Sequence, residues 1–209
     1  MKILIIIIVS LITITTTHPH TELGLGVIEV DINQTKEIRV FANKEEKEPE
    51  KAIRLVKLNG DIIIEEKDYS KWLKPESVWL DYSQFLFRFT KIEGDWIQII
   101  INNDSGGKKW IKKSTNLKNI YWDKFLIDNT TAIGTPISIE IKIAPSTESK
   151  TLRRSSTKDC FEAVEIKGDW LKIKTNETLE CNEHPEPIKS GWIKWKSDNK
   201  LIIDYFLTC

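Results

Sequence analysis

The alternation of apolar and polar residues predicts short β-strands along most of the chain. Two segments, "IEGDWIQI" (residues 92–99) and "IKGDWLKI" (residues 166–173), repeat this pattern with their tryptophans seventy-four positions apart. In each segment a Gly-Asp pair separates two apolar runs, which is typical of the tight turn of a β-hairpin because glycine tolerates a positive φ. The chain therefore contains two similar β units.

More strands complete each unit. The hairpin is followed by a turn-rich stretch, a short aromatic strand and a closing apolar segment, and it is preceded by a strand that enters a polar loop. These segments are "IRVFANKEE" (38–46), "KKWIKK" (108–113) and "IYWDKFLI" (120–127) in the first unit, and "IKIAPSTES" (141–149), "SGWIKW" (190–195) and "LIIDYFL" (201–207) in the second. Each unit reads as about five short strands in a small barrel or a pair of packed sheets.

The first unit carries about thirty additional residues between Ala52 and Asp81. Asn59-Gly60, between "IRLVKL" and "DIIIEE", predicts a hairpin turn. "DYSKWLKPES" predicts a turn or a short helix that ends before Pro75.

Strand alternation also predicts which side each tryptophan faces. Trp170 shares a side with Lys172, whereas Leu171 and Ile173 share the other. By the same alternation the repeated tryptophans Trp96, Trp110 and Trp192 lie beside polar residues and face outward. Such residues form either an aromatic platform for a ligand or a structural contact under loops or against the neighbouring unit.

The N-terminus has the pattern of a secretory signal peptide. Lys2 is followed by the apolar run of residues 3–12 and by small polar residues at 15–17, and the run is too short for a span of about 20 residues. An uncleaved anchor is the alternative. No other window approaches membrane-spanning length, so no membrane contact is expected after cleavage.

The charge balance and the absence of catalytic motifs argue against two classes of protein, nucleic-acid-binding proteins and enzymes. The chain balances 31 basic against 31 acidic residues without a long block of either sign, which argues against a nucleic-acid partner. It has no Gly-x-Ser-x-Gly elbow, His-Glu-x-x-His pair or phosphate-binding glycine loop. A nucleophile formed by Cys181 and His184 is conceivable, but secreted cysteines usually oxidise. Neither an enzyme nor a cofactor is expected.

The cysteines Cys160, Cys181 and Cys209 all lie in the C-terminal half. A hairpin centred on Gly168-Asp169 places Cys160 opposite about Glu177, close enough to Cys181 for a disulfide. Cys209 is either a free thiol or competes with Cys160 or Cys181 for the disulfide. Only His184 lies near the cysteines, so no metal site is expected.

The motifs resemble the bacterial SH3-like domain. The resemblance rests on Gly168-Asp169-Trp170 opening one strand and Gly191-Trp192-Ile193 on the next; the first unit has Lys109 where the second glycine would stand. It implies an all-β protein of two tandem SH3-like small β-barrels, the first with an inserted hairpin or loop region. The expected organisation is a signal peptide (residues 1–18), a first domain (19–135) and a second domain (136–209).

Domains of this class often attach proteins to peptidoglycan or recognise peptides. The resemblance therefore implies a secreted or periplasmic binding module whose partner is cell-wall peptidoglycan or a peptide or protein of the cell envelope. The candidate ligand-binding residues are Trp170, Trp192, Trp195 and Tyr205. The alternative is a structural or protein-interaction adaptor of the envelope, in which the tryptophans pack inside the protein.

Overall fold

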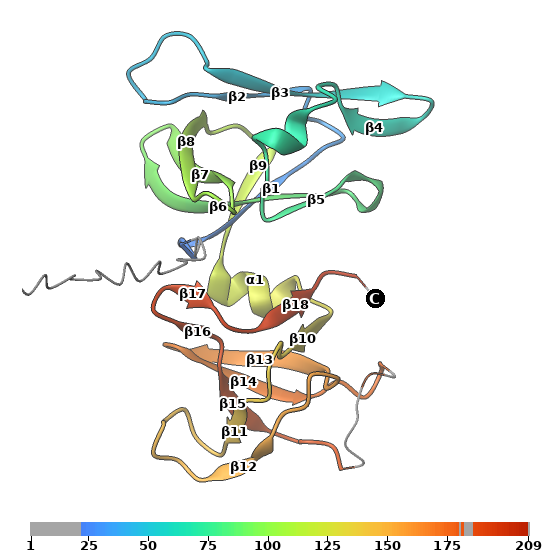
Figure 1. Ribbon diagram of the computed structural model, residues 1–209, viewed down its shortest axis with the longest axis vertical. Helices are drawn as coiled ribbons and strands as arrows, with labels where there is room; N and C mark the ends of the chain where they lie inside the picture. Colours follow the sequence, from blue (N-terminus) through green and yellow to red (C-terminus); the bar gives the residue numbers. More distant parts are fainter. Residues whose placement is uncertain (1–21, 180, 182–185, 209) are drawn as a thin grey trace, which may run out of the picture.

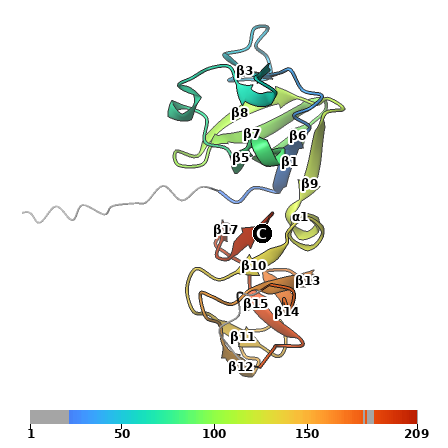
Figure 2. The same ribbon diagram turned by 90° about the vertical axis from the view of Figure 1, so that its right-hand side faces the viewer.

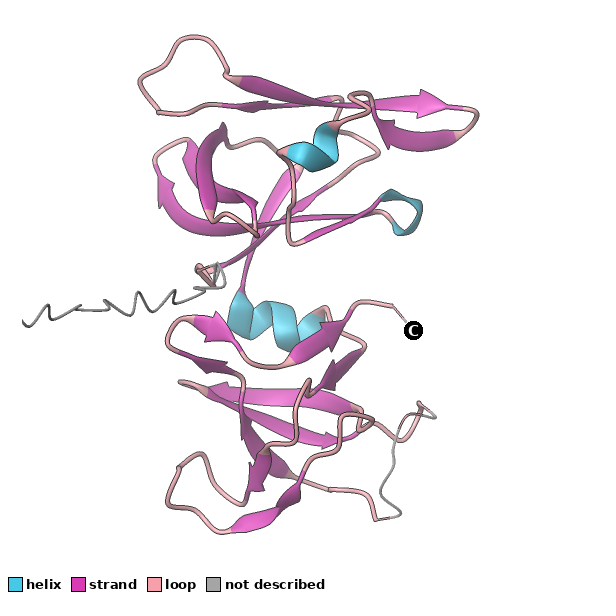
Figure 3. Cartoon of the chain, in the orientation of Figure 1, coloured by secondary structure: helices cyan, strands magenta, loops and turns pink. Residues whose placement is uncertain are grey.

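The protein is a stack of two β-rich halves joined by one short helix, as a computed structural model shows (Figure 1). The structure describes residues 22–179, 181 and 186–208. Nearly all of its regular structure is strand, which confirms the all-β class (Figure 3). The predicted signal peptide, residues 1–18, lies outside the described residues.

The two predicted hairpins and the aromatic strands that follow them are strands in the structure. The closing segment of the first unit, residues 120–127, lies mainly in a helix instead, and two strands at residues 26–30 and 132–134 were not predicted from the pattern. The first half consists of β1 (Gly26–Val30), β2 (Glu37–Val40), β3 (Lys51–Leu58), β4 (Asp61–Ile64), η1 (Tyr69–Lys71), β5 (Ser77–Trp79), η2 (Leu80–Tyr82), β6 (Gln84–Glu93), β7 (Trp96–Asn102), β8 (Gly107–Lys112) and β9 (Leu117–Tyr121). The helix α1 (Trp122–Asp128) follows. The second half consists of β10 (Ala132–Gly134), β11 (Glu140–Lys142), β12 (Thr151–Arg154), β13 (Phe161–Lys167), β14 (Trp170–Thr175), β15 (Gly191–Lys194), β16 (Lys196–Ser197), β17 (Lys200–Leu201) and β18 (Asp204–Phe206).

The two large sheets repeat one strand order. The first runs β8-β7-β6-β1-β9, with β5 also on β6, and the second runs β12-β11-β15-β14-β13-β10-β18. The pairs β1–β6 and β1–β9 therefore correspond to β10–β13 and β10–β18. Strand β10 lies before residue 136, the predicted start of the second domain, yet it pairs inside the second sheet. Among the described strands neither sheet closes on itself.

The central three-stranded ribbons also share their register. Trp96 opens β7 opposite Lys112, and Trp170 opens β14 opposite Lys194. The β6–β7 and β13–β14 hairpins each contain a β-bulge, with Thr90 as the extra residue in one and Val164 in the other. These two residues are also seventy-four positions apart. Because bulges set the bend and twist of a hairpin, the two ribbons share local shape as well as sequence.

The inserted segment contains the hairpin that Asn59-Gly60 predicted. Strands β3 and β4 pair from Leu58 and Asp61 outward, and both turn residues have positive φ, 54° for Asn59 and 101° for Gly60. This is the left-handed conformation that a two-residue hairpin loop needs. The 3-10 helix η1, four residues before Pro75, is the short helix expected there.

The two halves share apolar packing through α1. Trp122, Phe125 and Leu126 of the helix lie in one buried cluster with Leu86 of β6 and with Leu171 of β14. Figures 1 and 2 show α1 between the two sheets, and the helix contacts β1 and β9 of the first half and β13 of the second. A second cluster, centred on Phe85, Phe87 and Phe89, fills the first half alone. The halves are therefore joined by a common core, not only by a linker.

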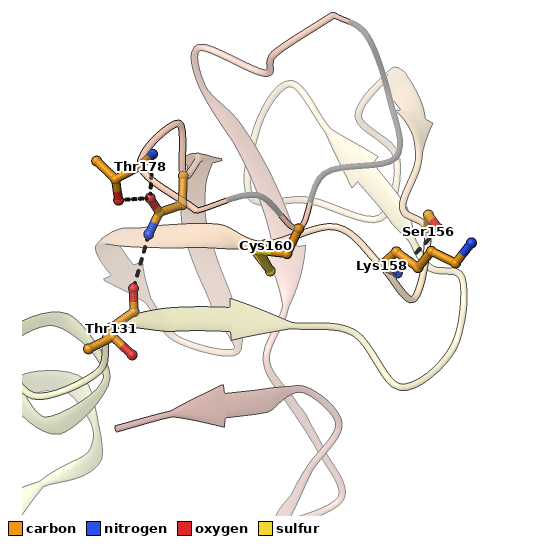
Figure 4. The surroundings of a disulfide bond; sticks show 7 residues. Thr131, Ser156, Lys158, Cys160 and Thr178 are labelled. Carbon is orange, nitrogen blue, oxygen red and sulfur yellow. Dashed lines mark hydrogen bonds between the residues drawn. A yellow bond between two sulfur atoms is a disulfide. The ribbon is translucent and has the colours of Figure 1, made fainter. Parts of the chain in front are cut away.

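The predicted disulfide joins Cys160 to Cys181, with their Cα atoms 5.7 Å apart. Because of the bulge in β13, Cys160 faces Asn176 and not Glu177: the Asn176 amide donates to the Cys160 carbonyl over 2.9 Å. The Asn176 side chain donates in turn to the carbonyl of Thr131 and accepts from Thr178 (Figure 4). The bridge thus closes a loop beside a well-bonded strand end.

No helix within the described ranges is both long enough and apolar enough to cross a membrane.

Candidate functional site

Strand alternation correctly identifies the aliphatic sides of the two ribbons. Ile97, Ile99 and Ile111 in the first half, and Leu171 and Ile173 in the second, are all buried. Trp96 and Trp170, which open the equivalent strands, are half-buried on the opposite side. Lysine ammonium groups lie over both rings, Lys112 at 5.2 Å from the Trp96 centroid and Lys194 at 5.8 Å from that of Trp170.

The outward direction of the other two repeated tryptophans does not make them accessible. Trp110 is 8% exposed and Trp192 is 5% exposed. Lys44 lies over the Trp110 ring, and Lys167 and Lys172 lie over that of Trp192. The aliphatic stems of such lysines can cover an aromatic surface while their charges stay in water. Of the two alternatives left open for these tryptophans, the burial of Trp110 and Trp192 favours the structural contact over the open platform.

The four candidate residues of the second half do not form one open aromatic surface. Trp195 is 4% exposed, and its indole N–H donates to the carbonyl of Gly168 over 3.0 Å. Tyr205 packs edge-on against Phe125 at the junction, with ring centroids 5.3 Å apart. Burial, and then the nearby carboxylate of Glu76, raise the pKa of its phenol far above the ordinary value. No ring contact in the described structure joins any two of Trp170, Trp192, Trp195 and Tyr205.

A more accessible site lies in the first half. We call it the β2–β8 groove: a hollow of about 630 Å³ between β2, the loop that follows it and the end of β8. The residues around it include Thr35, Lys36, Arg39, Lys47, Lys112 and Lys113. The two sides of the groove are far apart in sequence. They meet because Phe41 exchanges two 2.8 Å backbone hydrogen bonds with Trp110.

One aromatic ring, that of Phe41, lines the β2–β8 groove, and the ring of Trp96 supports it from outside the lining. Phe41, which lines the groove, packs edge-on against Trp96 with ring centroids 5.0 Å apart and planes at 87°. Lys112 lines the groove and lies over the same Trp96 ring. Apolar surface and positive charge therefore stand side by side, an arrangement that suits an amphipathic ligand.

The charges around the groove are predominantly positive. Of its two carboxylates, Glu37 is engaged by Arg39 at 2.7 Å and by Arg54 at 3.0 Å. Hydrogen bonds from these two guanidinium groups hold the pKa of Glu37 below its ordinary value. In the described part of the chain, none of the exposed lysines Lys36, Lys47, Lys112 and Lys113 forms a salt bridge.

A buried hydroxyl lies beside these charges. Thr35 is 8% exposed and lines the groove, and its Oγ1 has no hydrogen-bond partner within the described structure. A buried polar atom without a partner is disfavoured, so its presence calls for a physical reason. A ligand acceptor that enters the groove is one such reason.

The second half lacks this arrangement although it repeats the strands. Trp192 pairs with Lys142, whereas the equivalent Trp110 pairs with Phe41. Two residues before these partners, the second half therefore has Glu140 where the first half has Arg39. The Glu140 carboxylate lies 2.6 Å from Lys142. The buried Trp195 follows Lys194 where Lys113 follows Lys112. The groove belongs to the first half because its charged residues are not repeated.

Sequence reasoning did not identify the groove. "KKWIKK" contained Lys112 and Lys113, but Thr35 and Lys36 stood outside every motif.

Within residues 22–179, 181 and 186–208, no three His, Cys, Asp or Glu side chains are grouped so that they could hold a metal ion.

Comparisons with known proteins give no family assignment. No family model matches the sequence, and no curated protein matches it. Among solved structures, NlpC2 from Trichomonas vaginalis aligns with 88% of this chain at 9% identity and a TM-score of 0.34. The chain spans about half of the length of that structure, since the alignment covers 49% of it. A likeness this low assigns neither fold nor function.

Proposed function

We propose that the protein is a non-enzymatic binding module, secreted or periplasmic, that recognises peptides of cell-wall peptidoglycan. In this proposal the chain consists of two tandem SH3-like units, the first enlarged by the β3–β4 hairpin. The repeated strand order and the two equivalent bulges support the duplication. We place the boundary between α1 and β10, a few residues before the boundary expected from sequence. The disulfide supports an oxidising compartment.

The observation that carries the proposal is the β2–β8 groove. It combines a volume of about 630 Å³ with the Phe41–Trp96 aromatic pair and several free lysines. Ligand sites are usually concave, with a few polar groups that orient the ligand on apolar walls. The stem peptides of peptidoglycan offer both carboxylates and short apolar side chains, so their chemistry complements this surface. In this proposal the ligand contacts move from Trp170, Trp192, Trp195 and Tyr205 to the first half.

A second candidate function is a protein-interaction adaptor of the envelope without a small ligand. A cleft of about 870 Å³ at the junction of the two halves supports it. Leu25, Tyr121 and Val164 line this cleft and are 48%, 50% and 42% exposed. Exposed apolar side chains that lie together are typical of interaction surfaces. In this case the groove and the junction cleft would contact different partners.

Cosedimentation with purified, protein-free peptidoglycan tests the first proposal. The wild-type chain is expected to pellet with the polymer, and Trp96→Ala is expected to stay largely in the supernatant while its circular dichroism spectrum remains that of the wild type. Trp79→Ala is the matched control, because Trp79 is 50% exposed and packs on Tyr82, whereas Trp96 supports the lining residues Phe41 and Lys112. A wild-type chain that remains soluble at all polymer concentrations would reject peptidoglycan as the partner.

A further inference from the structure

Four lysines without a described salt bridge line the β2–β8 groove together, and their gathering around one hollow is what marks this surface. Elsewhere lysines commonly have a carboxylate neighbour: Lys109 contacts Glu50 at 2.5 Å, Lys174 contacts Glu162 at 2.9 Å and Lys167 contacts Glu165 at 3.0 Å. Around the groove, Lys36 and Lys47 on one side and Lys112 and Lys113 on the other form no described salt bridge. Like charges gathered on a concave surface raise the local positive potential and attract an anionic ligand.

The Thr35 hydroxyl adds an independent and directional feature. It is buried, lines the groove and lacks a partner in the described structure, whereas the buried hydroxyl of Thr135 in the second half donates to Ser155 Oγ at 2.9 Å. A hydroxyl donates one hydrogen bond and can accept others. The oxygen itself is covered by neighbouring atoms, so a carboxylate oxygen satisfies the donor once the Thr35 side chain turns toward the groove, and the lysines would neutralise the charge of that carboxylate.

The geometry points to a carboxylate-bearing peptide as the ligand class of the β2–β8 groove. We propose that one carboxylate of the peptide accepts a hydrogen bond from Thr35 Oγ1 while Lys36, Lys47, Lys112 and Lys113 surround it with positive charge. The apolar part of the peptide packs on Phe41 beside Trp96. This inference rests on the proposed binding role, and it adds that the ligand is recognised through its carboxylates and not through its sugars.

Titration calorimetry with two matched tetrapeptides tests the inference. One peptide carries a glutamate side-chain carboxylate and a free C-terminus, and the other has both groups as amides. The full chain is expected to bind the acidic peptide at least about tenfold more tightly, since charge-assisted hydrogen bonds are about twice as strong as neutral ones. The affinity for the acidic peptide should also fall as salt is raised. Equal affinity for the two peptides, or no heat of binding with either, would overturn the inference.

Two variants separate recognition from folding. Lys113→Ala is expected to weaken binding of the acidic peptide by about threefold to tenfold, whereas Lys150→Ala, an exposed lysine of the second half, leaves it unchanged. Thr35→Val removes an unpartnered hydroxyl at nearly constant volume, so the melting temperature should hold or rise while affinity falls by about fivefold. A purely structural Thr35 would give lower stability with unchanged affinity, which contradicts the inference.

The peptide and polymer experiments fail independently. If the chain pellets with peptidoglycan but does not distinguish the acidic peptide from its amide, the carboxylate inference is rejected and the binding role stands. If it binds the acidic peptide and not the polymer, the ligand class is supported and peptidoglycan is rejected as its source.

Discussion

The hydroxyl of Tyr205 donates a hydrogen bond of 2.5 Å to Glu76 Oε1, joining the last strand of the second half to the segment before β5 in the first. The Glu76 side chain is 6% exposed and also accepts from Arg88 Nε at 2.5 Å and from Asn103 Nδ2 at 2.8 Å. Arg88 in turn lies over the ring of Trp122, 5.7 Å from its centroid. One buried carboxylate therefore holds together groups from both halves.

Replacing Tyr205 by phenylalanine should destabilise the protein without changing its shape. The variant keeps the ring packing on Phe125 but removes the donor to a buried charge, which typically contributes about 1.5–3 kcal/mol. Urea denaturation measures the change in unfolding free energy. Tyr82→Phe, at a position that is 55% exposed, should be neutral. Equal unfolding midpoints for wild type and Tyr205→Phe would show that the bond does not stabilise the junction.

Removing the negative charge of Glu76 should have a larger effect. In Glu76→Gln the guanidinium of Arg88, whose side chain is 13% exposed, loses its counter-ion, and an uncompensated buried charge costs about 3–5 kcal/mol. Glu50→Gln removes an exposed ion pair with Lys109 and should cost less than about 1 kcal/mol. Thermal unfolding of both variants provides the comparison, and losses of similar size would contradict the view of Glu76 as the centre of the junction.

The junction also predicts a loss of stability in alkali. Burial, followed by the charge of Glu76, raises the pKa of Tyr205, so the folded protein keeps a phenol proton that the unfolded chain loses above about pH 10. The contribution is complete below that pH and declines as pH rises, because folding then requires proton uptake. The unfolding free energy of the wild type should therefore fall more steeply above pH 10 than that of Tyr205→Phe. Parallel curves would exclude this linkage.

The sequence predicted the repeated ribbons because their signals are local. Gly94-Asp95 and Gly168-Asp169 define two hairpins, and alternation from those turns assigns Ile97 and Leu171 to the buried sides. The one-residue error opposite Cys160 arose from the bulge at Val164, which no local pattern marks.

The site was harder to predict because alternation gives the side that a residue faces and not what covers it. Trp192 faces away from Ile193, yet two lysines lie over it. Thr35 and Lys113 line one groove only because β2 meets β8, a long-range pairing without a sequence motif. The hydrogen-bond partner of Tyr205, Glu76, is 129 positions away in the sequence. No local pattern could therefore show that Tyr205 lies at the junction of the two halves, and it was named as a candidate ligand residue.

Loss of the disulfide should destabilise the second half. The bridge closes a loop of 21 residues, and replacing both Cys160 and Cys181 by serine should cost about 2–5 kcal/mol. Denaturation of the wild type with and without reductant measures the same quantity, and reductant should have no further effect on the double variant. An unchanged midpoint after confirmed reduction would mean that the hairpin base is held by its hydrogen bonds alone.

The most direct measurement of the central claim is a set of ¹H–¹⁵N spectra recorded while soluble peptidoglycan fragments are added. Shifts are expected to be confined to amides of residues 35–41, 47–48 and 111–114, which border the β2–β8 groove. Amides beside Trp170 and Trp192 are expected to stay in place. Shifts centred on those two tryptophans, or a spectrum that does not change, would contradict the claim.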